Sequence, residues 1–505
     1  MPSFFINGKN LTLDILRDIA HKKIKVSLDK TTKKHMMESF ACVQRWTQEG
    51  KIIYGLNTGF GRLSDVKIDN GQNKALQLNL IRSHACGVGP AFSEPETRAI
   101  MLLRAQVLAS GYSGVRPLIV ETLLALLNKN VIPVIPQKGS VGASGDLAPL
   151  AHLALTLVGE GEVFYRSKKI PASKALSLAH ISPVQLLGRE GLALINGTQV
   201  MTALGAQNIL KTEQLLTLCD IASALSLEAC LGSRMAFHPA IHTLRPHSGQ
   251  IQVAKNLWRL TQNSKIQKSH KDCNKIQDSY SFRCIPQVHG SSRDAWAFAK
   301  KCIETELNSV TDNPLIFVKE DFCLSGGNFH GQVLSQAMDF LSIALATLVN
   351  ISERRIEKLL DPTFSGLPTF LAHKEGLESG LMLAHVTAAA LASQNKVLAH
   401  PASVDTIPTS GNKEDHVSMG VHAALKAKEI LSNAEDVLAI ELLAASQGIE
   451  FRRPLITSPV LEKVMAMIRK KIPPITQDRI FSKDIQEMKT LFPDILSQAQ
   501  DKSIE

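Results

Sequence analysis

The sequence is poor in aromatic residues: Phe, Trp and Tyr make up 5% of its 505 residues, and Tyr occurs only four times. Strands of sandwiches and barrels are enriched in aromatic and β-branched side chains. Hydrophobic residues nevertheless account for 44% and charged residues for 20%, both ordinary for a globular protein. An interior rich in Leu and Ala and short of aromatic rings favours packed helices over a β-sandwich.

The eight cysteines are scattered, and no C-x-x-C pair occurs among them. This spacing argues against a zinc knuckle or a dithiol redox motif, so we expect no metal site. The sequence also lacks a run of about 18 uncharged apolar residues, and the segment "MPSFFINGKNLTLD" shows no basic stretch followed by an apolar core. We therefore expect no membrane span, no secretory signal and a cytoplasmic protein with reduced thiols.

The net charge of +10 raises the question of a nucleic-acid partner. The basic residues, however, lie in short pieces such as "HKKIK" and "IRKKI", without a long basic arm and without interleaved aromatic side chains. We expect no nucleic-acid binding. A basic surface equally suits an anionic small-molecule substrate.

Apolar residues recur at three- and four-residue spacing over long stretches from about residue 196 onward. The opening 140 residues instead mix short helices with loops, beginning with an extended piece and a helix capped near Thr12. We predict a mainly α fold with a long central helix bundle, divided into residues 1–200 and a bundle with a C-terminal helical tail at 201–505. Because a bundle this extended usually needs partner chains to cover it, we expect a homo-oligomer.

The stretch "GSVGASGDLAPLAHLAL", residues 139–155, crowds glycine and serine just before a helical pattern. In the simplest interpretation, Ser144 or Asp146 caps a helix that begins near Leu147. The phosphate loop G-x-x-x-x-G-K-[ST] is absent, and Asp146 stands where the nucleophile elbow G-x-S-x-G needs its last glycine. A further interpretation is backbone chemistry, in which the Gly145 amide nitrogen attacks the Ala143 carbonyl carbon.

This stretch closely resembles the signature of the aromatic amino acid ammonia-lyase family, in which the inner Ala-Ser-Gly cyclises into 4-methylideneimidazol-5-one (MIO). The matching residues are Ala143, Ser144 and Gly145. The resemblance runs along nearly the whole chain, through "IIYGLNTGFG", "NLIRSHACGVG", "ALINGTQ", "QDSYSFRCIPQVHG", "ELNSVTDNPLIF", "SGGNFHGQ" and "PASVDTIPTSGNKEDHVSMG". It implies elimination of ammonia from an amino acid, no external cofactor, a smaller N-terminal domain that carries the electrophile loop, and a homotetramer whose active sites draw on several chains.

The resemblance also implies roles for individual residues. Tyr54 matches the family's catalytic tyrosine, the base that removes the β-proton, and Tyr280 matches a second tyrosine that assists at the electrophile. Arg283 matches the carboxylate-binding arginine, whose fork fits a carboxylate in a bidentate pair. The remaining matches to binding positions are Asn196, Gln277 and Phe329. Without the motif, core packing would be the favoured interpretation of Tyr54, and core packing, a turn or a surface ion pair would explain the other residues.

Two polar residues at ring-contact positions resemble the branch of the family that acts on histidine. His84 stands in a Ser-His pair, and Glu414 precedes Asp415-His416. A phenyl ring would leave both groups unpaired, at roughly 1–3 kcal/mol each. The resemblance therefore implies conversion of L-histidine to trans-urocanate; a structural histidine and a helix cap are the plainer interpretations.

Three departures keep other substrates open. Gly411 and Lys413 replace the usual residues of the histidine-type block, and "NFHGQ" leans toward the phenylalanine and tyrosine branch. The alternatives are a tyrosine or phenylalanine ammonia-lyase or 2,3-aminomutase, and, more remotely, a catalytically inactive scaffold.

Overall fold

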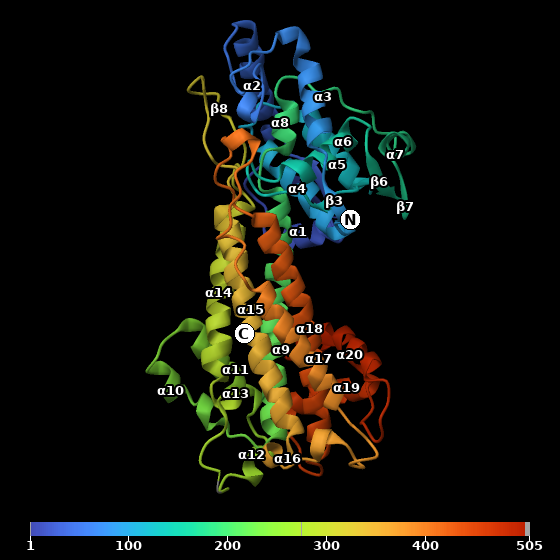
Figure 1. The fold of residues 1–505 in the computed structure, drawn as a ribbon, viewed down its shortest axis with the longest axis vertical. Coiled ribbons are helices and arrows are strands. Elements are labelled where there is room, and N and C mark those ends of the chain that lie inside the picture. Colours follow the sequence, from blue (N-terminus) through green and yellow to red (C-terminus); the bar gives the residue numbers. More distant parts are fainter. Residues whose placement is uncertain (1, 274, 500–505) are drawn as a thin grey trace. The chain divides into compact units, whose positions relative to one another are not determined.

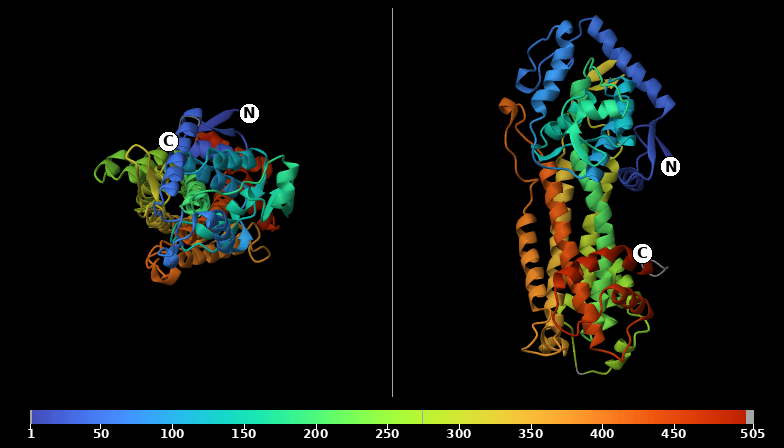
Figure 2. Two further views of the ribbon diagram at one scale, coloured as in Figure 1. Left: turned by 90° about the horizontal axis from the view of Figure 1, so that it is seen from above. Right: turned by 90° about the vertical axis from the view of Figure 1, so that its right-hand side faces the viewer.

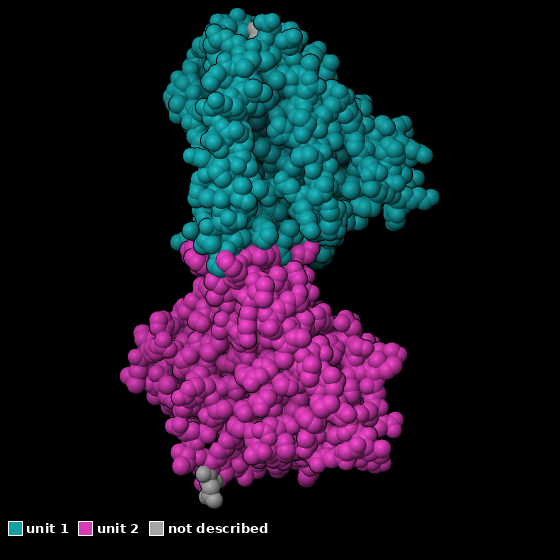
Figure 3. Space-filling model, viewed as in Figure 1, with its two compact units in different colours: residues 1–207, 300–338, 401–425 teal, residues 208–299, 339–400, 426–505 magenta. Residues whose placement is uncertain are grey.

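The computed structural model describes residues 2–273 and 275–499, which form two compact units (Figure 3). Unit 1 takes the residues up to 207 together with 300–338 and 401–425, and unit 2 takes 208–299, 339–400 and the residues from 426 onward. The division differs from the predicted boundary at residue 200. Two later segments return to the N-terminal part of the chain, where Asp312 pairs with Arg189 and Ser418 bonds to Gly142.

The predicted mainly α fold is confirmed (Figure 1). Unit 1 contains β1 (Ser3–Ile6), α1 (Leu13–Ala20), β2 (Lys25–Leu28), α2 (Lys30–Gln48), α3 (Asn73–His84), β3 (Val88–Ala91), α4 (Glu94–Ala109), α5 (Pro117–Asn128), β4 (Ile132–Pro133), β5 (Pro136–Lys138), α6 (Leu147–Leu157), β6 (Glu162–Tyr165), β7 (Lys168–Pro171), α7 (Ala172–Leu178), α8 (Glu190–Ile195), β8 (Leu315–Phe317) and β9 (Phe322–Leu324). Its strands make small sheets: β1 pairs parallel to β2, while β3–β5, β4–β6–β7 and β8–β9 are antiparallel.

Local sequence explains where the first helices of unit 1 begin and end. Thr12 caps α1 as predicted, its side chain accepting a hydrogen bond from the Ile15 amide. The buried Arg98 of α4 donates to the carbonyls of Ile19 and Leu127, near the C-terminal ends of α1 and α5. Both carbonyls lie in the last turn of their helix, so one guanidinium links the ends of α1 and α5 to α4.

The described residues of unit 2 form helices and loops, with no strand among them. It contains α10 (Pro239–Thr243), α11 (Ser248–Leu260), α12 (Lys265–Ser269), α13 (Tyr280–Arg283), α16 (Pro362–Ser365), α17 (Met382–Leu398), α19 (Pro459–Lys471), α20 (Phe481–Thr490) and α21 (Phe492–Ala499). Four of the five passages of the chain between the units lie within α9 (Gln199–Ala229), α14 (Ile285–Glu306), α15 (Gln332–Leu360) and α18 (Gly420–Glu450), and the fifth lies between residues 400 and 401.

Buried ion pairs link the long helices of unit 2, which run side by side in both Figure 1 and Figure 2. Arg355 of α15 pairs with Glu441 of α18 at 2.6 Å, with both side chains fully buried. The carboxylate of Asp220 in α9 pairs with His289 and Arg293 of α14. Burial raises the free energy of unpaired charges steeply, so these pairs fix the register of the bundle.

The helix α15 is long and apolar enough to cross a membrane, the one such helix in the part of the chain that the structure describes. Of its apolar window, 72% is buried within the protein, as is usual for the central helix of a bundle. Among residues 2–273 and 275–499, no group of three His, Cys, Asp or Glu side chains is arranged to hold a metal ion.

Candidate active site

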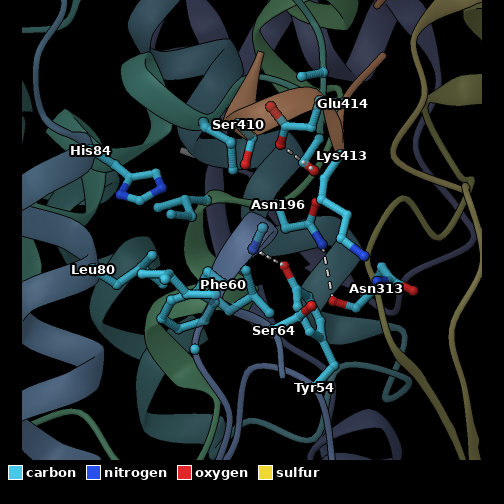
Figure 4. Close-up of a pocket in the computed structure, with 18 of the residues that line it drawn as sticks. Tyr54, Phe60, Ser64, Leu80, His84, Asn196, Asn313, Ser410, Lys413 and Glu414 are labelled. Carbon is cyan, nitrogen blue, oxygen red and sulfur yellow. Dashed lines mark hydrogen bonds between the residues drawn. The ribbon is translucent and has the colours of Figure 1, made fainter. Parts of the chain in front are cut away.

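A cavity of about 880 Å³ lies in unit 1 (Figure 4). It gathers side chains from segments far apart in the sequence: the loop after α2, the helix α3, the stretch before α6, the end of α8, and the two returning segments. The predicted site residues that line it are Tyr54, His84, Ala143, Ser144, Asn196, Phe329 and Glu414.

The backbone beside Ser144 leaves no space for side chains at two of its glycines. Gly142 and Gly145 both have φ of +70°, in the left-handed region. A Cβ at Gly145 would lie 2.2 Å from the carbonyl oxygen of Gly197, and one at Gly142 would lie 2.1 Å from the Ser418 hydroxyl. Only glycine satisfies both the dihedral angle and the contact.

Asp146 anchors this stretch from its C-terminal side. Its amide donates to the carbonyl of Gly197 at 2.7 Å. Its carboxylate accepts the amides of Val200 and Met201, at 2.8 and 3.0 Å, and the hydroxyl of Ser140 at 3.1 Å. Asp146 thus satisfies the first turn of α9, whereas the cap on α6 that we considered for Ser144 or Asp146 is not made. Burial raises the pKa of Asp146 to about 7, against its hydrogen bonds.

Three long helices begin around the same stretch. The Met201 sulfur of α9 lies so close to Gly331 and Gly420 that a Cβ on either would come within 2.2 or 2.5 Å of it. Gly331 immediately precedes α15, and Gly420 opens α18. Helix N-termini carry partial positive charge, so the region around this stretch favours negative charge, as the buried Asp146 carboxylate at the start of α9 illustrates.

Tyr54 lies in the cavity with its hydroxyl accepting the Gly61 amide at 3.2 Å and its ring edge-on to Phe60 (Figure 4). Burial raises the pKa of Tyr54 above that of a free phenol, and the nearby Glu414 adds to this, while the Gly61 amide and Arg189 lower it. A single chain therefore leaves Tyr54 a weak acid.

Asn196 is held in one orientation. Its side-chain Nδ2 donates to the main-chain carbonyl of Asn313 at 3.0 Å. Its main-chain carbonyl accepts a hydrogen bond from Arg104. Behind it the fully buried Arg189 and Asp312 pair at 3.0 Å. The Asn196 Oδ1 is buried and has no hydrogen-bond partner among the described residues, so it remains an available acceptor at the cavity wall.

Glu414 faces Ser144 at the reacting end of the cavity. Its Oε1 accepts the Ser144 hydroxyl at 3.4 Å, and its Oε2 accepts the Thr409 hydroxyl at 2.8 Å. The departure at Gly411 has a local explanation, because φ there is +61°. Lys413 lines the cavity as well.

His84 ends α3 at the cavity wall, and its Nδ1 lies 3.1 Å from the Ser83 hydroxyl. Burial lowers the pKa of His84, opposed by the charge of Glu414, which favours a neutral imidazole. A neutral ring can both donate and accept, as a polar substrate ring requires.

Three predicted residues lie elsewhere. Gln277, Tyr280 and Arg283 belong to unit 2 and are not among the residues that line this cavity. The Arg283 guanidinium stacks 4.6 Å over the Tyr280 ring, and Tyr280 is 69% exposed. Among the described residues that line the cavity, Lys413 is the only Lys or Arg.

The sequence analysis missed several lining residues, chiefly Phe60, Leu80, Ser410, His330 and His416. Each lies within a few positions of a residue that was singled out, and the rings of His330 and His416 stack in parallel, 5.8 Å apart. Adjacency to the motif residues was the only signal available for them.

Comparison with known proteins places these observations in a family. The family model described as aromatic amino acid lyase matches residues 11–470. A histidine ammonia-lyase of Koribacter versatilis is 50% identical, over 97% of this chain and 98% of its own. The crystal structure of histidine ammonia-lyase from Trypanosoma cruzi superposes with a TM-score of 0.92 at 40% identity, covering 100% of this chain and 96% of that one. The tyrosine aminomutase from Streptomyces globisporus superposes with a TM-score of 0.93 at 35% identity, covering 100% and 99%.

Proposed function

This chain belongs to the aromatic amino acid lyase family, and from that premise we propose that it is a histidine ammonia-lyase. It eliminates ammonia from L-histidine and releases trans-urocanate. The observation that carries the assignment is the presence of His84 and Glu414 in the same cavity as Ser144. A phenyl ring offers no hydrogen bond to either group, whereas an imidazole ring can bond to both.

The residues around Ser144 fit an MIO group formed from Ala143, Ser144 and Gly145. Gly145 is held in a left-handed turn against Gly197, without room for a Cβ. Such a turn suits an amide nitrogen that bends back toward the Ala143 carbonyl. When formed, the group supplies an electrophile that takes the substrate amine and makes it a better leaving group.

Tyr54 is the proposed base for the β-proton. The Gly61 amide at its oxygen stabilises a phenolate, while burial opposes one. Because the cavity itself leaves the phenol weakly acidic, further positive charge has to reach Tyr54 in the working enzyme. The helix N-termini at residues 199, 332 and 420 favour the negative charge that the substrate and the reacting groups carry.

Arg283 is the proposed partner of the substrate carboxylate, with Asn196 fixing the amino acid end. Since Arg283, Tyr280 and Gln277 belong to unit 2 and the cavity belongs to unit 1, we propose that a second copy of the chain supplies them. This proposal agrees with the homotetramer with shared active sites that the family resemblance implies.

Subunit complementation tests the sharing. Tyr54→Phe and Arg283→Ala each inactivate a homo-oligomer, but a mixed oligomer formed by co-expression contains some sites with both native residues. We expect activity to return in the mixture. Activity that stays at the level of the single variants would place Tyr54 and Arg283 of one site on one chain.

The direct test of the function is the appearance of urocanate absorbance when purified protein is mixed with L-histidine. Ser144→Ala is the matched control, because it cannot form the methylidene; activity should fall by several orders of magnitude. Wild-type protein that produces no urocanate would refute the assignment.

A second candidate is a lyase or 2,3-aminomutase acting on tyrosine or phenylalanine. It is favoured by the close superposition on a tyrosine aminomutase and by Lys413, whose charge is adjacent to Glu414 in the sequence. Product analysis with all three amino acids separates the candidates, since an aminomutase yields a β-amino acid and a lyase an unsaturated acid.

A further inference from the structure

Ser418 lies directly behind the stretch that carries Ser144, and none of the roles described above uses it. It is fully buried. Its hydroxyl donates to the carbonyl of Gly142 at 3.2 Å and accepts the amide of Gly420 at 3.4 Å. The next residue, Met419, donates its amide to the carbonyl of Val141 at 2.9 Å. Residues 418–420 therefore hold Val141 and Gly142, which lie just before the turn, in place by hydrogen bonds.

Asp146, which lies just after the turn, is held independently. Its amide and carboxylate bond to Gly197 and to the start of α9. Ala143, Ser144 and Gly145 are thus the only residues between two anchors, and the two anchors come from distant parts of the sequence. A segment held at both ends spends more of its time with its reacting atoms close together, which is the usual source of fast intramolecular reactions.

We propose that Ser418 is a positioning residue for formation of the MIO electrophile, acting through its hydrogen bond to the Gly142 carbonyl. The inference rests on the proposed function. In ring closure the Gly145 nitrogen bonds to the Ala143 carbonyl carbon. The carbonyl oxygen departs as water with the amide protons of Gly145 and Ser144. The Ser144 hydroxyl then departs with its own Cα proton as a second water, and no oxidant is needed.

The hydroxyl is the part of Ser418 that matters for this role. The Gly142–Ala143 peptide plane is fixed when its carbonyl is bonded, and this plane determines where the Ala143 carbonyl carbon points. The amide of Gly420 bonds to the same hydroxyl, which strengthens it as a donor. Packing alone would survive replacement by alanine, whereas the fixed peptide plane would not.

The experiment follows dehydration directly. Full-length chains are made by cell-free synthesis, samples are stopped with acid over time, and intact mass gives the fraction that has lost two waters. Ser418→Ala removes the donor, and Ser418→Cys keeps the size with a weaker donor. Ser39→Ala is the matched control, because Ser39 is equally buried in α2 and its hydroxyl has no partner among the described residues.

We expect ring closure in Ser418→Ala to slow roughly two- to tenfold, the factor that one net hydrogen bond contributes, with Ser418→Cys in between and Ser39→Ala unchanged. Melting temperatures measured on the same proteins separate this effect from general destabilisation. If both Ser418 variants dehydrate as fast as wild type, or if dehydration slows only in proportion to lost stability, the inference is wrong. A wild-type chain that loses no water would instead overturn the proposed function.

Discussion

Replacing Asp146 tests how the cavity floor is held together. Asp146→Ala removes the acceptor of two backbone amides, Val200 and Met201, and of the Ser140 hydroxyl. Asp146 is fully buried, so its hydrogen-bond donors lie away from bulk solvent. Each buried donor left without a partner costs about 1–3 kcal/mol, and the two amides together cost roughly 2–6 kcal/mol.

Asp146→Asn provides the informative contrast. Its amide oxygen can accept both backbone amides, and its NH₂ group can donate to Ser140, whose hydroxyl is free to rotate. We therefore expect Asp146→Asn to lower the free energy of unfolding by about 1 kcal/mol or less near neutral pH, and Asp146→Ala to lower it by more.

Because Asp146 can be either protonated or ionised, the stability of the wild type also depends on pH. Burial raises the pKa of Asp146 to about 7 in the folded protein, above its usual value of 3.8. A raised carboxyl pKa means that the folded state binds the proton more tightly. The associated stability is complete below about pH 4 and is lost as the pH rises through 7, by roughly 4 kcal/mol at about 1.36 kcal/mol per unit. Asn has no such proton, so its stability relative to wild type should improve over this range.

Thermal unfolding from pH 4 to 8 ranks wild type, Ala and Asn, and hydrogen exchange at the amides of Val200 and Met201 localises the change. Asp29→Ala is a control, since Asp29 is an ordinary cap that accepts the Thr32 amide at the start of α2. Equal stability of Ala and Asn would refute the capping argument. Parallel pH profiles for wild type and Asn would refute the raised pKa.

Three further outcomes test the proposed site. Tyr54→Phe keeps the ring against Phe60 and should lower kcat about 10²–10⁴-fold with little change in melting temperature; a loss below threefold assigns the base elsewhere. His84→Leu combined with Glu414→Gln should lower kcat/KM for histidine by about 10²-fold or more, and for phenylalanine far less; equal losses for all substrates contradict the specificity argument. Gly145→Ala, measured by intact mass, should abolish the two-water loss, because its Cβ would meet Gly197 at 2.2 Å; normal dehydration would exclude the proposed turn.

Features encoded over a few residues could be predicted from the sequence. The spacing of apolar residues from about residue 196 onward predicted the long helices of the bundle, and Thr12 predicted its cap, because both signals lie within a helix or one turn of it. The helix α14 carries a weaker signal of this kind. Its segment "IPQVHGSSRDAWAFAKKCIETE" mixes polar and apolar residues, since it buries the polar His289 and Arg293 against Asp220.

Features that depend on distant partners could not be predicted in this way. Asp146 was considered as a cap for the helix that follows it, yet its carboxylate serves α9, which begins 53 positions later. The return of 300–338 and 401–425 to unit 1 is likewise fixed by buried pairs such as Arg189 with Asp312, and no local pattern reveals it. The family motifs supplied seven of the residues that line the cavity, but they did not show that Arg283 is not among them.

The anchors around Ser144 have a consequence for biosynthesis. Gly197 and Ser418 are made long after Ala143, Ser144 and Gly145, so the turn cannot reach its folded form until the ribosome has passed residue 418. On the proposed chemistry, a nascent or truncated chain stays unreactive, and only a correctly folded one becomes armed. A chain whose mass is lower by two waters has therefore reached its native structure at least once, even if it has unfolded since.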